Sequence, residues 1–337
     1  MNIRSVRGYS ILIKRNSITT PKNAGDRIRW PISYHPTRVL LVCYNRPLAE
    51  RIKARVGAQG YVNTWYGFCH AFLESRGHAL DFSRVQADPA FWQRVQEQVT
   101  GEDIPPEWTF DALIVDEGQD FETEWLEILN LFLREGAAIL WLEDPVQNLQ
   151  DKPPVATEGF VGYRCSINYR SPESIARFIR DTLPFEFDLG NDLPGLGVGV
   201  HGYTEPEEQP RLVARIVQDL VRRGFSHDHI VVLTCRGVRH SVFSDFDQVG
   251  GIRLRRFTGG YNMNGDQVLT AGQLRFDSVY RFKGQEASAV ILVDVDPDGG
   301  RLEREERVLF CGMTRATVRL ELVVRAGNSE NRRFLES

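Results

Sequence analysis

The stretch Asp111–Phe121, DALIVDEGQDF, joins a short apolar run to three acidic side chains. Continuous apolar runs of about four to eight residues, rich in β-branched side chains, are typical of strands buried on both faces of a parallel sheet. In open sheets of this kind, ligands bind beyond the carboxyl ends of the strands, which is where Asp116 would stand. The stretch therefore predicts an α/β fold with an acidic site at one edge of a sheet.

Similar apolar runs recur along the chain, and helix-like segments separate them. The further strand candidates are RVLLVC (38–43), AAILWL (137–142), IVVLT (230–234), AVILVDV (289–295) and LELVV (320–324). The helix candidates are NRPLAERIKARV (45–56), ETEWLEILNLFLRE (122–135) and QPRLVARIVQDLVRRG (209–224). The last two helix candidates have apolar residues at three- and four-residue spacing, as one buried helix face requires. Strands that alternate with helices predict parallel sheets.

A linker near the middle of the chain predicts two domains. The stretch QDKPPVAT (150–157) has a proline pair and no periodicity, so we place a boundary near residue 158. The first domain would span 1–157, with a degenerate N-terminus and a small helical insertion at about 65–108, and the second would span 158–337. A chain of 337 residues is long enough for two domains that each have a core.

The composition excludes several classes of protein. The chain is 42% hydrophobic and 26% charged, and its formal net charge of -4 means that any nucleic-acid site must be a local groove. Its five cysteines form no C-x-x-C pair, which argues against a disulfide framework and against a zinc site. Since no stretch approaches the roughly 18 apolar residues of a membrane span, we expect a cytoplasmic protein without a membrane segment.

The acids after the strand have two interpretations. Asp116 could hold Mg²⁺ directly or through water, and Glu117 could orient and deprotonate an attacking water, because Mg²⁺ favours one or two carboxylates and keeps several waters. Alternatively, the acids would only complement the dipole of the helix that follows. The choice between these interpretations depends on the other motifs of the chain.

Several stretches, in order along the chain, together resemble the superfamily 1 DNA helicases of UvrD/Rep type. They are CYNRPLAERIKARV (43–56), VNTWYGFCHAF (62–72), VDEGQDF (115–121), LWLEDPVQNL (140–149), NYRS (168–171), YRFKGQEASAVIL (280–292) and MTRAT (313–317). The resemblance covers roughly residues 38 to 325. It implies two RecA-like (P-loop NTPase-type) domains, with parallel sheets and flanking helices, that clamp ATP and Mg²⁺ between them and step along single-stranded DNA.

The resemblance also implies roles for individual residues in a nucleotide site. Asp116 would coordinate Mg²⁺, and Glu117 would be the general base of ATP hydrolysis. Gln147 would sense the γ-phosphate, and Arg170 and Arg315 would reach it from the second domain. Planar cations stabilise the charge on transferring phosphoryl oxygens, and supplying them from a second domain couples hydrolysis to domain closure.

The stretch at 280–292 would link the nucleotide to DNA. Glu286 would bind the ribose, while Lys283 and Gly284 would lie near the phosphates or the DNA backbone. Three positions depart from the glycine, histidine and leucine that are usual in the family, and they are Glu143, Tyr280 and Gln285.

Local signals predict a rigid position for Arg170. Ser171 is a good N-cap, and Pro172 suits the first turn of a helix, so Arg170 would stand at a fixed helix entry.

On the DNA side, the resemblance implies contacts from two stretches of the first domain. Asn45 and Arg46 could contact phosphates, and Thr64 could contact the DNA backbone. Trp65 or Phe68 would lie near bases, because stacking on aromatic rings tolerates any base sequence. The alternative for these rings is a helix face packed into the core. The expected partners are single-stranded or partly duplex DNA, with repair or recombination proteins as further candidates.

The phosphate loop of the family is missing from the sequence. Members that hydrolyse ATP carry G-x-x-x-x-G-K-S/T, whose backbone N–H groups and lysine hold the phosphates. The corresponding stretch, GYSILIKRNSITTPKNAGDRIRWPISYHPT (8–37), contains no G-K-T or G-K-S, and its prolines would break the helix that should follow. SILI (10–13) could still be the strand before the loop. A truncated or rearranged gene start, an inactive relative, or a site completed by another chain would each explain the sequence.

Two functions follow from these patterns. The first is an ATP-dependent DNA helicase of UvrD/Rep type, or a truncated member, with impaired ATP hydrolysis. The second is a catalytically inactive, helicase-derived module that binds single-stranded DNA or a repair partner. A nuclease is disfavoured, because no further carboxylate or histidine motif lies near the acid pair to bind two metals.

Overall fold

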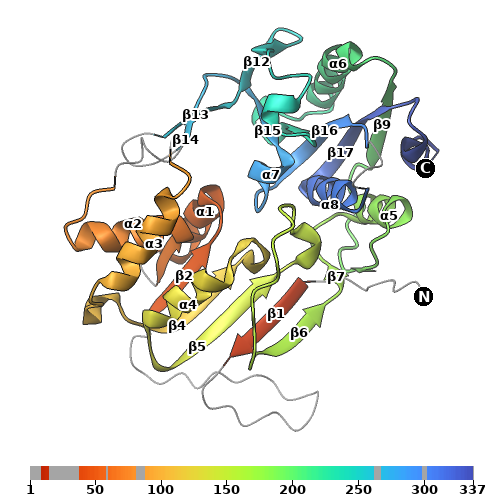
Figure 1. Ribbon diagram of the computed structural model, residues 1–337. Helices are drawn as coiled ribbons and strands as arrows, with labels where there is room; N and C mark the ends of the chain where they lie inside the picture. Colours follow the sequence, from red (N-terminus) through yellow and green to blue (C-terminus); the bar gives the residue numbers. More distant parts are fainter. Residues whose placement is uncertain are drawn as a thin grey trace. The chain divides into compact units, whose positions relative to one another are not determined.

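The computed structural model describes residues 9–14, 38–57, 60–80, 88–261, 267–297 and 302–336. The chain divides into two compact units, whose elements are labelled in Figure 1. The N-terminal unit comprises Tyr9–Pro145 and Lys152–Cys165, and the C-terminal unit comprises Val146–Asp151 and residues from Ser166 onward. The chain therefore leaves the N-terminal unit after Pro145, returns at Lys152 and leaves it again after Cys165. The fold is mixed α/β with mainly parallel sheets.

The N-terminal unit is built on a six-stranded sheet in the order β3-β2-β4-β5-β1-β6. Its strands are β1 (Tyr9–Lys14), β2 (Val39–Cys43), β3 (Tyr61–Thr64), β4 (Phe110–Asp116), β5 (Leu133–Glu143) and β6 (Val161–Cys165). Its helices are α1 (Arg46–Val56), α2 (Trp65–Ser75), α3 (Phe91–Gly101) and α4 (Thr123–Leu131), with 3-10 turns at Pro106–Trp108 and Gly118–Asp120. A further 3-10 turn, Pro145–Gln147, begins at the last residue before the chain leaves this unit. The main core lies between the sheet and α2, α3 and α4, and α1 packs near Cys43 in a separate small cluster. The predicted strands at 38–43, 112–116 and 137–142 all form.

The predicted helix at 122–135 is shorter than its apolar pattern suggests. Helix α4 ends at Leu131, and β5 begins at Leu133. Leu133 is paired with Phe110 of β4, and the Phe110 N–H donates to the Phe132 carbonyl over 2.8 Å. The last residues of the periodic stretch therefore pair in the sheet and do not continue the helix.

Strand β1 runs against its neighbours. SILI does form a strand, but β1 is antiparallel to both β5 and β6, whereas β2, β3, β4 and β5 are parallel to one another. In β1, Ser10 pairs with Glu143 and Lys14 pairs with Ile139. The carboxyl end of β1 therefore lies at the edge of the sheet opposite to Asp116. Residues 15–37, where the phosphate loop would lie, are outside the described residues.

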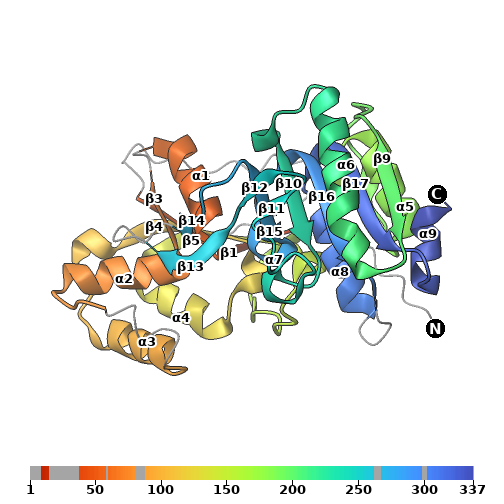
Figure 2. The ribbon, with the colours of Figure 1, turned by 90° about the horizontal axis from the view of Figure 1, so that it is seen from above.

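The C-terminal unit has a seven-stranded sheet in the order β11-β12-β15-β10-β16-β17-β9. Its strands are β9 (Val198–Tyr203), β10 (Ile230–Thr234), β11 (Gln248–Val249), β12 (Ile252–Arg255), β15 (Leu274–Ser278), β16 (Ala287–Val295) and β17 (Ala316–Arg325), and two small ladders pair β7 (Ile167–Asn168) with β8 (Asp188–Leu189) and β13 (Phe257–Tyr261) with β14 (Gln267–Leu269). Its helices are α5 (Glu173–Thr182), α6 (Gln209–Arg222), α7 (Val279–Phe282), α8 (Leu302–Met313) and α9 (Arg332–Leu335), with 3-10 turns at Pro206–Glu208, His227–His229, Val238–His240 and Ser329–Asn331. Helix α6 covers one face of this sheet, and α5 and α8 cover the other (Figure 2). Apart from β11, its strands are parallel.

No helix among the described residues is long and apolar enough to cross a membrane.

A buried carboxylate in the C-terminal unit predicts a specific dependence of stability on pH. Glu321 of β17 is 3% exposed and lies 2.8 Å from both His201 Nε2 and Arg319 Nε. Burial alone would raise the pKa of Glu321, but the hydrogen bonds from His201 and Arg319 outweigh burial and lower that pKa. A carboxyl whose pKa is lowered on folding stabilises the fold above its unfolded pKa of about 4.3 and loses this contribution as the pH falls through the folded value.

We therefore expect Glu321→Gln to lower the Tm at pH 7, and the difference in Tm from the wild type to shrink below about pH 4. Thermal melts across this pH range check the prediction. A difference in Tm that stays constant with pH would contradict it.

Candidate functional site

The carboxyl edge of the N-terminal sheet collects several of the predicted site residues. Cys43, which ends β2, is paired with Thr64 at the end of β3 and with Asp116 at the end of β4. Asn45 follows β2 at the same edge, and β5 ends there at Glu143. The apolar runs thus bring Asn45, Thr64 and Asp116 to one edge, as parallel strands require.

The residues after β4 form a constrained turn, which we call the acid turn (residues 116–122). Glu117 has φ 58° and ψ 43°, a left-handed conformation that is uncommon outside glycine. Gly118 packs against the Trp141 ring, where an added Cβ would lie 2.4 Å from ring atoms. Gln119 Nε2 donates to Glu117 Oε2 over 2.5 Å. Backbone conformations of this kind are concentrated at functional sites, because the surrounding structure must hold them.

The two predicted catalytic acids are half-buried at this edge. Asp116 Oδ1 accepts a hydrogen bond from the Glu117 N–H over 3.0 Å. Burial raises the pKa of the Cys43 thiol, and the nearby charges of Asp116 and Glu117 raise it further. The described residues contain no group of three or more His, Cys, Asp or Glu side chains placed to hold a metal ion.

Two of the predicted DNA-contact residues cap helices. Asn45 Oδ1 accepts from the Leu48 N–H over 2.9 Å at the start of α1, and Thr64 Oγ1 accepts from the Gly67 N–H over 3.0 Å at the start of α2. Arg46, the first residue of α1, is half-buried. Both helix N-termini thus lie at the carboxyl edge, where the positive ends of the helix dipoles favour phosphate oxygens.

Trp65 and Phe68 belong to the core, which corrects their predicted place near bases. Trp65 is 1% exposed and Phe68 is 0% exposed. Trp65 stacks on Trp125 with ring centroids 5.2 Å apart, and Phe68 meets Phe132 edge-to-face at 4.8 Å. In this structure neither ring is open to a base. The alternative of a helix face packed into the core applies to both.

An aromatic residue that the sequence analysis missed lies at the same edge. Tyr44, the residue after β2, is half-buried and stacks on Trp125 with ring centroids 6.3 Å apart and ring planes 11° apart. Trp125 in turn stacks on Trp65, so the three rings form one column. Lys152 Nζ lies 5.3 Å from the Tyr44 ring centre and 4.6 Å from that of Trp125. The sequence signal that could have identified Tyr44 as a site residue is its position directly after a predicted strand.

In the C-terminal unit, Arg315 is fully buried and is bound only through neutral groups. Its exposure is 0%, and no carboxylate of the described residues lies within 4 Å of its guanidinium nitrogens. Its hydrogen-bond acceptors are the carbonyl oxygens of Cys311 (3.0 Å) and Gln285 (3.4 Å), the Thr314 hydroxyl (3.1 Å) and Gln147 Oε1 (3.1 Å). Lys283, 4% exposed, donates to the Gln147 carbonyl over 2.7 Å. Gln147 thus lies with Arg315 and Lys283 in the C-terminal unit, although the sequence placed it in residues 1–157.

Arg170 and Glu286 come together in the same unit. Arg170 is exposed, and its Nε lies 4.0 Å from Glu286 Oε2. The turn before α5 differs from the predicted cap: Asn168 Oδ1 accepts from the Arg170 and Ser171 N–H groups, and Pro172 occupies the N-cap position. The cap shifts because the first N–H groups of α5 donate to the carbonyls of Leu193 and Pro194.

Gly284 has φ 77°, a conformation that favours glycine, and so makes the sharp turn between α7 and β16.

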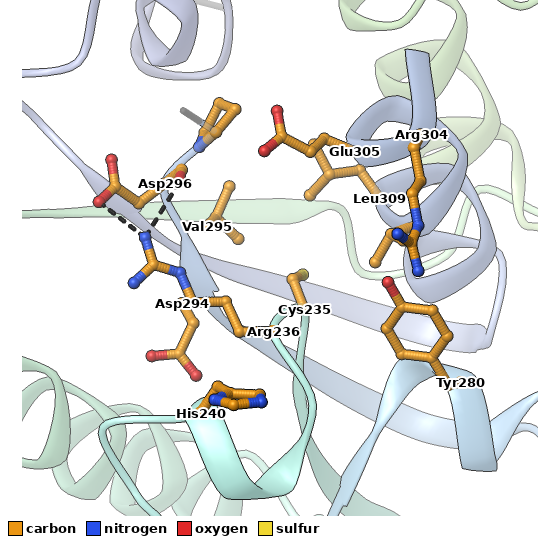
Figure 3. A pocket seen from close by; sticks show the side chains of 12 residues that line it. Cys235, Arg236, His240, Tyr280, Asp294, Val295, Asp296, Arg304, Glu305 and Leu309 are labelled. Atoms are coloured by element: carbon orange, nitrogen blue, oxygen red, sulfur yellow. Dashed lines mark hydrogen bonds and ion pairs between the residues drawn. The ribbon is translucent and has the colours of Figure 1, made fainter. Parts of the chain in front are cut away.

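A pocket opens at the carboxyl ends of β10 and β16. These strands are neighbours, but the chain continues from β10 towards β11 and β12 and from β16 through α8 to β17. Neighbouring strands whose connections diverge in this way form a ligand-binding crevice in open parallel sheets. The pocket has a volume of about 700 Å³ (Figure 3). Its polar and aromatic lining includes Arg236, His240, Tyr280, Asp296 and Arg304.

Two carboxylates shape this pocket. Asp294, which is 3% exposed, accepts hydrogen bonds from the hydroxyls of Thr234 and Ser241, each over 2.6 Å, and so ties the two strand ends together. Asp296 pairs with Arg236 over 3.0 Å, as Figure 3 shows. This pocket was not predictable from the sequence, because its lining residues carry no recognisable motif apart from Tyr280.

Comparisons with known proteins bear mainly on the C-terminal unit. Residues 273–323 match the model of the UvrD-like helicase C-terminal domain, and this segment includes Lys283, Gly284, Glu286 and Arg315. Among solved structures, the C-terminal domain of a possible DNA helicase from Lactobacillus plantarum WCFS1 is similar, with 19% identity over 48% of this chain and 90% of that chain and a TM-score of 0.32. No curated protein matches the chain. The family match relates the segment to helicases.

Proposed function

We propose that this chain is an ATP-dependent DNA helicase of UvrD/Rep type, which couples Mg²⁺-ATP hydrolysis to movement along single-stranded DNA and hydrolyses ATP slowly. The observation that carries the proposal is the buried guanidinium of Arg315, whose described partners are all neutral. A buried cation without a counter-charge is costly, so this group favours an anion. A phosphoryl group suits the planar fork of a guanidinium, and Arg315 lies inside the segment that matches the helicase family model.

In this proposal each unit is a RecA-like domain that carries residues acting on the nucleotide. The N-terminal unit supplies Asp116 as the metal ligand and Glu117 as the general base. When bound, Mg²⁺ would neutralise charge on the phosphates and orient them. The C-terminal unit supplies Arg315 and Gln147 for the γ-phosphate, with Lys283 in the same cluster.

Arg170 and Glu286 complete the proposed nucleotide site in the C-terminal unit. Arg170 is 49% exposed at its side chain and so can move towards a phosphate, while Glu286 would bind the ribose and Gly284 would let the chain turn close to the ligand.

Slow hydrolysis follows from the direction of β1. A loop that started directly after Lys14 would begin at the edge opposite to the acid turn, because Lys14 pairs with Ile139, four residues before Glu143. At about 3.3 Å per residue, that offset is about 13 Å along the strand. The sequence also lacks the G-K-S/T that would hold the phosphates. Losing several charge-assisted hydrogen bonds, each contributing about 1.5–3 kcal/mol, would weaken ATP binding by orders of magnitude.

Single-stranded DNA would be bound by two local features of the described residues. The first is the aromatic column that Tyr44 ends, beside the N-termini of α1 and α2. The second is the pocket of the C-terminal unit, in which Arg236 and Arg304 offer charge and Tyr280 offers a ring. Stacking platforms combined with local cations are the usual means of binding single strands without sequence preference.

Turnover of Mg²⁺-ATP by the full chain, measured with and without an oligo-dT strand, tests the proposed function. We expect slow hydrolysis that requires Mg²⁺ and is faster with the oligonucleotide. The absence of both ATP binding and hydrolysis would reject the enzyme.

A second candidate function is a catalytically inactive module that binds single-stranded DNA or a repair partner. The antiparallel direction of β1 relative to β5 favours it. It predicts DNA binding that weakens with salt and does not respond to ATP. A change of DNA affinity on adding Mg²⁺-ATP would exclude this second candidate.

The aromatic column yields a prediction that separates DNA binding from folding. Tyr44→Ala should weaken oligo-dT binding by about 5- to 150-fold, the equivalent of about 1–3 kcal/mol for one stacked base, with only a small change in stability. Trp65→Ala should instead lower the free energy of unfolding by about 3–5 kcal/mol, because its ring is buried. Fluorescence anisotropy and denaturant melts measure the two effects, and Tyr44→Phe is the matched control that keeps the ring. Unchanged DNA affinity in Tyr44→Ala would remove Tyr44 from the DNA site.

A further inference from the structure

The acid turn binds both ends of a segment that leaves the N-terminal unit. The chain departs after Pro145, and Val146–Asp151 belongs to the C-terminal unit. Just before the departure, the Asp144 N–H donates to Gln119 Oε1 over 2.9 Å. Just after the return, Lys152 Nζ donates to the Asp120 carbonyl over 2.8 Å and to Glu122 Oε1 over 3.0 Å. One turn therefore holds the chain on both sides of the interruption.

Within the C-terminal unit, the segment itself is held by cations. Gln147 binds the Arg315 guanidinium through its side chain and the Lys283 ammonium through its carbonyl. Asp151 pairs with Arg307 and lies 3.8 Å from Arg304 Nε. Its own φ is 54°, a left-handed conformation next to the point where the chain returns. The segment thus has firm contacts at its start and at its end.

Gln119 is placed to connect the segment with Glu117. It is 6% exposed, and both ends of its amide are used, with Oε1 accepting from Asp144 N and Nε2 donating to Glu117 Oε2. Buried amides keep such bonds, because breaking one leaves a polar group without a partner. Glu117 is also fixed by its left-handed backbone. Because the Gln119 side chain bonds to both groups, a displacement of Asp144 would move the Glu117 carboxylate.

We propose that Gln119 is a positioning residue, which orients the Glu117 carboxylate according to where the Val146–Asp151 segment lies. This inference rests on the proposed function, in which Glu117 is the general base. The orientation of the Glu117 carboxylate would then depend directly on the segment that carries Gln147. Hydrolysis would then reach its full rate only when the segment holds Asp144 in the position that aligns Gln119. Small misplacements of catalytic groups lower the rate by as much as 10²-fold.

Two substitutions of Gln119 in the full chain distinguish its hydrogen bond to Asp144 from its hydrogen bond to Glu117. Gln119→Glu keeps an acceptor for the Asp144 N–H but has no donor for Glu117. Gln119→Leu removes both hydrogen bonds at similar size. Three measurements are made on each variant: amide exchange at Asp144, the ¹³C chemical shift of the Glu117 carboxyl at a single pH, and kcat and KM for ATP. The Glu117 signal is assigned by its loss in Glu117→Gln.

We expect exchange of the Asp144 amide to become at least about tenfold faster in Gln119→Leu and to stay unchanged in Gln119→Glu, because only the glutamate keeps the acceptor. In both variants the ¹³C signal of the Glu117 carboxyl should move from its wild-type position, because neither new side chain can donate the hydrogen bond that Gln119 Nε2 gives to Glu117 Oε2. Both variants should lower kcat by about 10- to 100-fold and leave KM within about twofold, since Gln119 orients a catalytic group without binding ATP.

An unchanged Glu117 carboxyl signal in both variants, or unchanged Asp144 exchange in Gln119→Leu, would overturn the inference. Equal kcat in the wild type and Gln119→Glu would also overturn it. If the wild type does not hydrolyse ATP, the proposed function fails, while the exchange and chemical-shift measurements still decide whether Gln119 holds Glu117. Thermal melts of both variants show whether they are folded at the temperature of the measurements.

Discussion

Glu117→Gln should lower Mg²⁺-ATP turnover by about 10²- to 10⁴-fold, because an amide cannot accept the proton of the attacking water. The exchange of one oxygen for nitrogen keeps the shape of the side chain. Its remaining oxygen can still accept the hydrogen bond from Gln119 Nε2. We therefore expect the Tm and the affinity for ATP to stay close to those of the wild type, so that the loss lies in kcat.

The matched control for this change is Glu124→Gln, an exposed glutamate in the first turn of α4. It removes the same charge close to the acid turn without touching Glu117. Steady-state turnover with saturating oligo-dT compares the two variants. Full turnover in Glu117→Gln would show that another group takes the proton, and equal losses in both variants would indicate a general effect of charge.

Arg315→Ala should lower turnover by about 10³-fold or more, the effect expected when a cation that stabilises the transferring phosphoryl group is lost. Arg315→Lys should fall between alanine and the wild type, because lysine keeps a charge but lacks the planar fork that binds two oxygens. Arg315→Ala also removes the 3.1 Å hydrogen bond to Gln147 Oε1, so we expect this variant to have a lower Tm.

Lysine at position 315 is the informative variant if alanine prevents folding. The control is Arg177→Ala on α5, whose side chain is 54% exposed and pairs with Glu173 within its own helix. Single-turnover kinetics and thermal melts give the chemical step and the stability separately. A folded Arg315→Lys variant with full turnover would remove Arg315 from the proposed nucleotide site.

The strands were predictable, because burial on both faces leaves a local pattern. IVVLT forms β10 (Ile230–Thr234), and all five of its residues are buried. Helix α4 shows the limit of the same reasoning. Its apolar spacing continues to residue 133, but pairing between Leu133 and Phe110 ends the helix earlier. A periodic pattern reports which side chains are buried and does not report which partner buries them.

The aromatic residues show the same limit within the candidate site. Trp65 and Phe68 lie in one helicase-like stretch and are buried, whereas Tyr44 lies in another, was given no role there, and is partly open at the carboxyl edge. Composition and spacing are alike for a ring that packs in a core and one that stacks on a base. Burial by α4, which brings Trp125 against Trp65, decides between them.

The sequence by itself determined the alternation of strands and helices and the acid pair at the end of β4, because both depend on neighbours along the chain. It also showed that no G-K-S/T stretch is present. Only the tertiary structure decided that β1 runs antiparallel to β5 and that Gln147 lies against Arg315. Gln147 and Arg315 are 168 positions apart, and Ser10 pairs with Glu143 across a similar gap in the chain. Strand direction and the partner of a buried charge depend on such distant contacts, which local patterns do not encode.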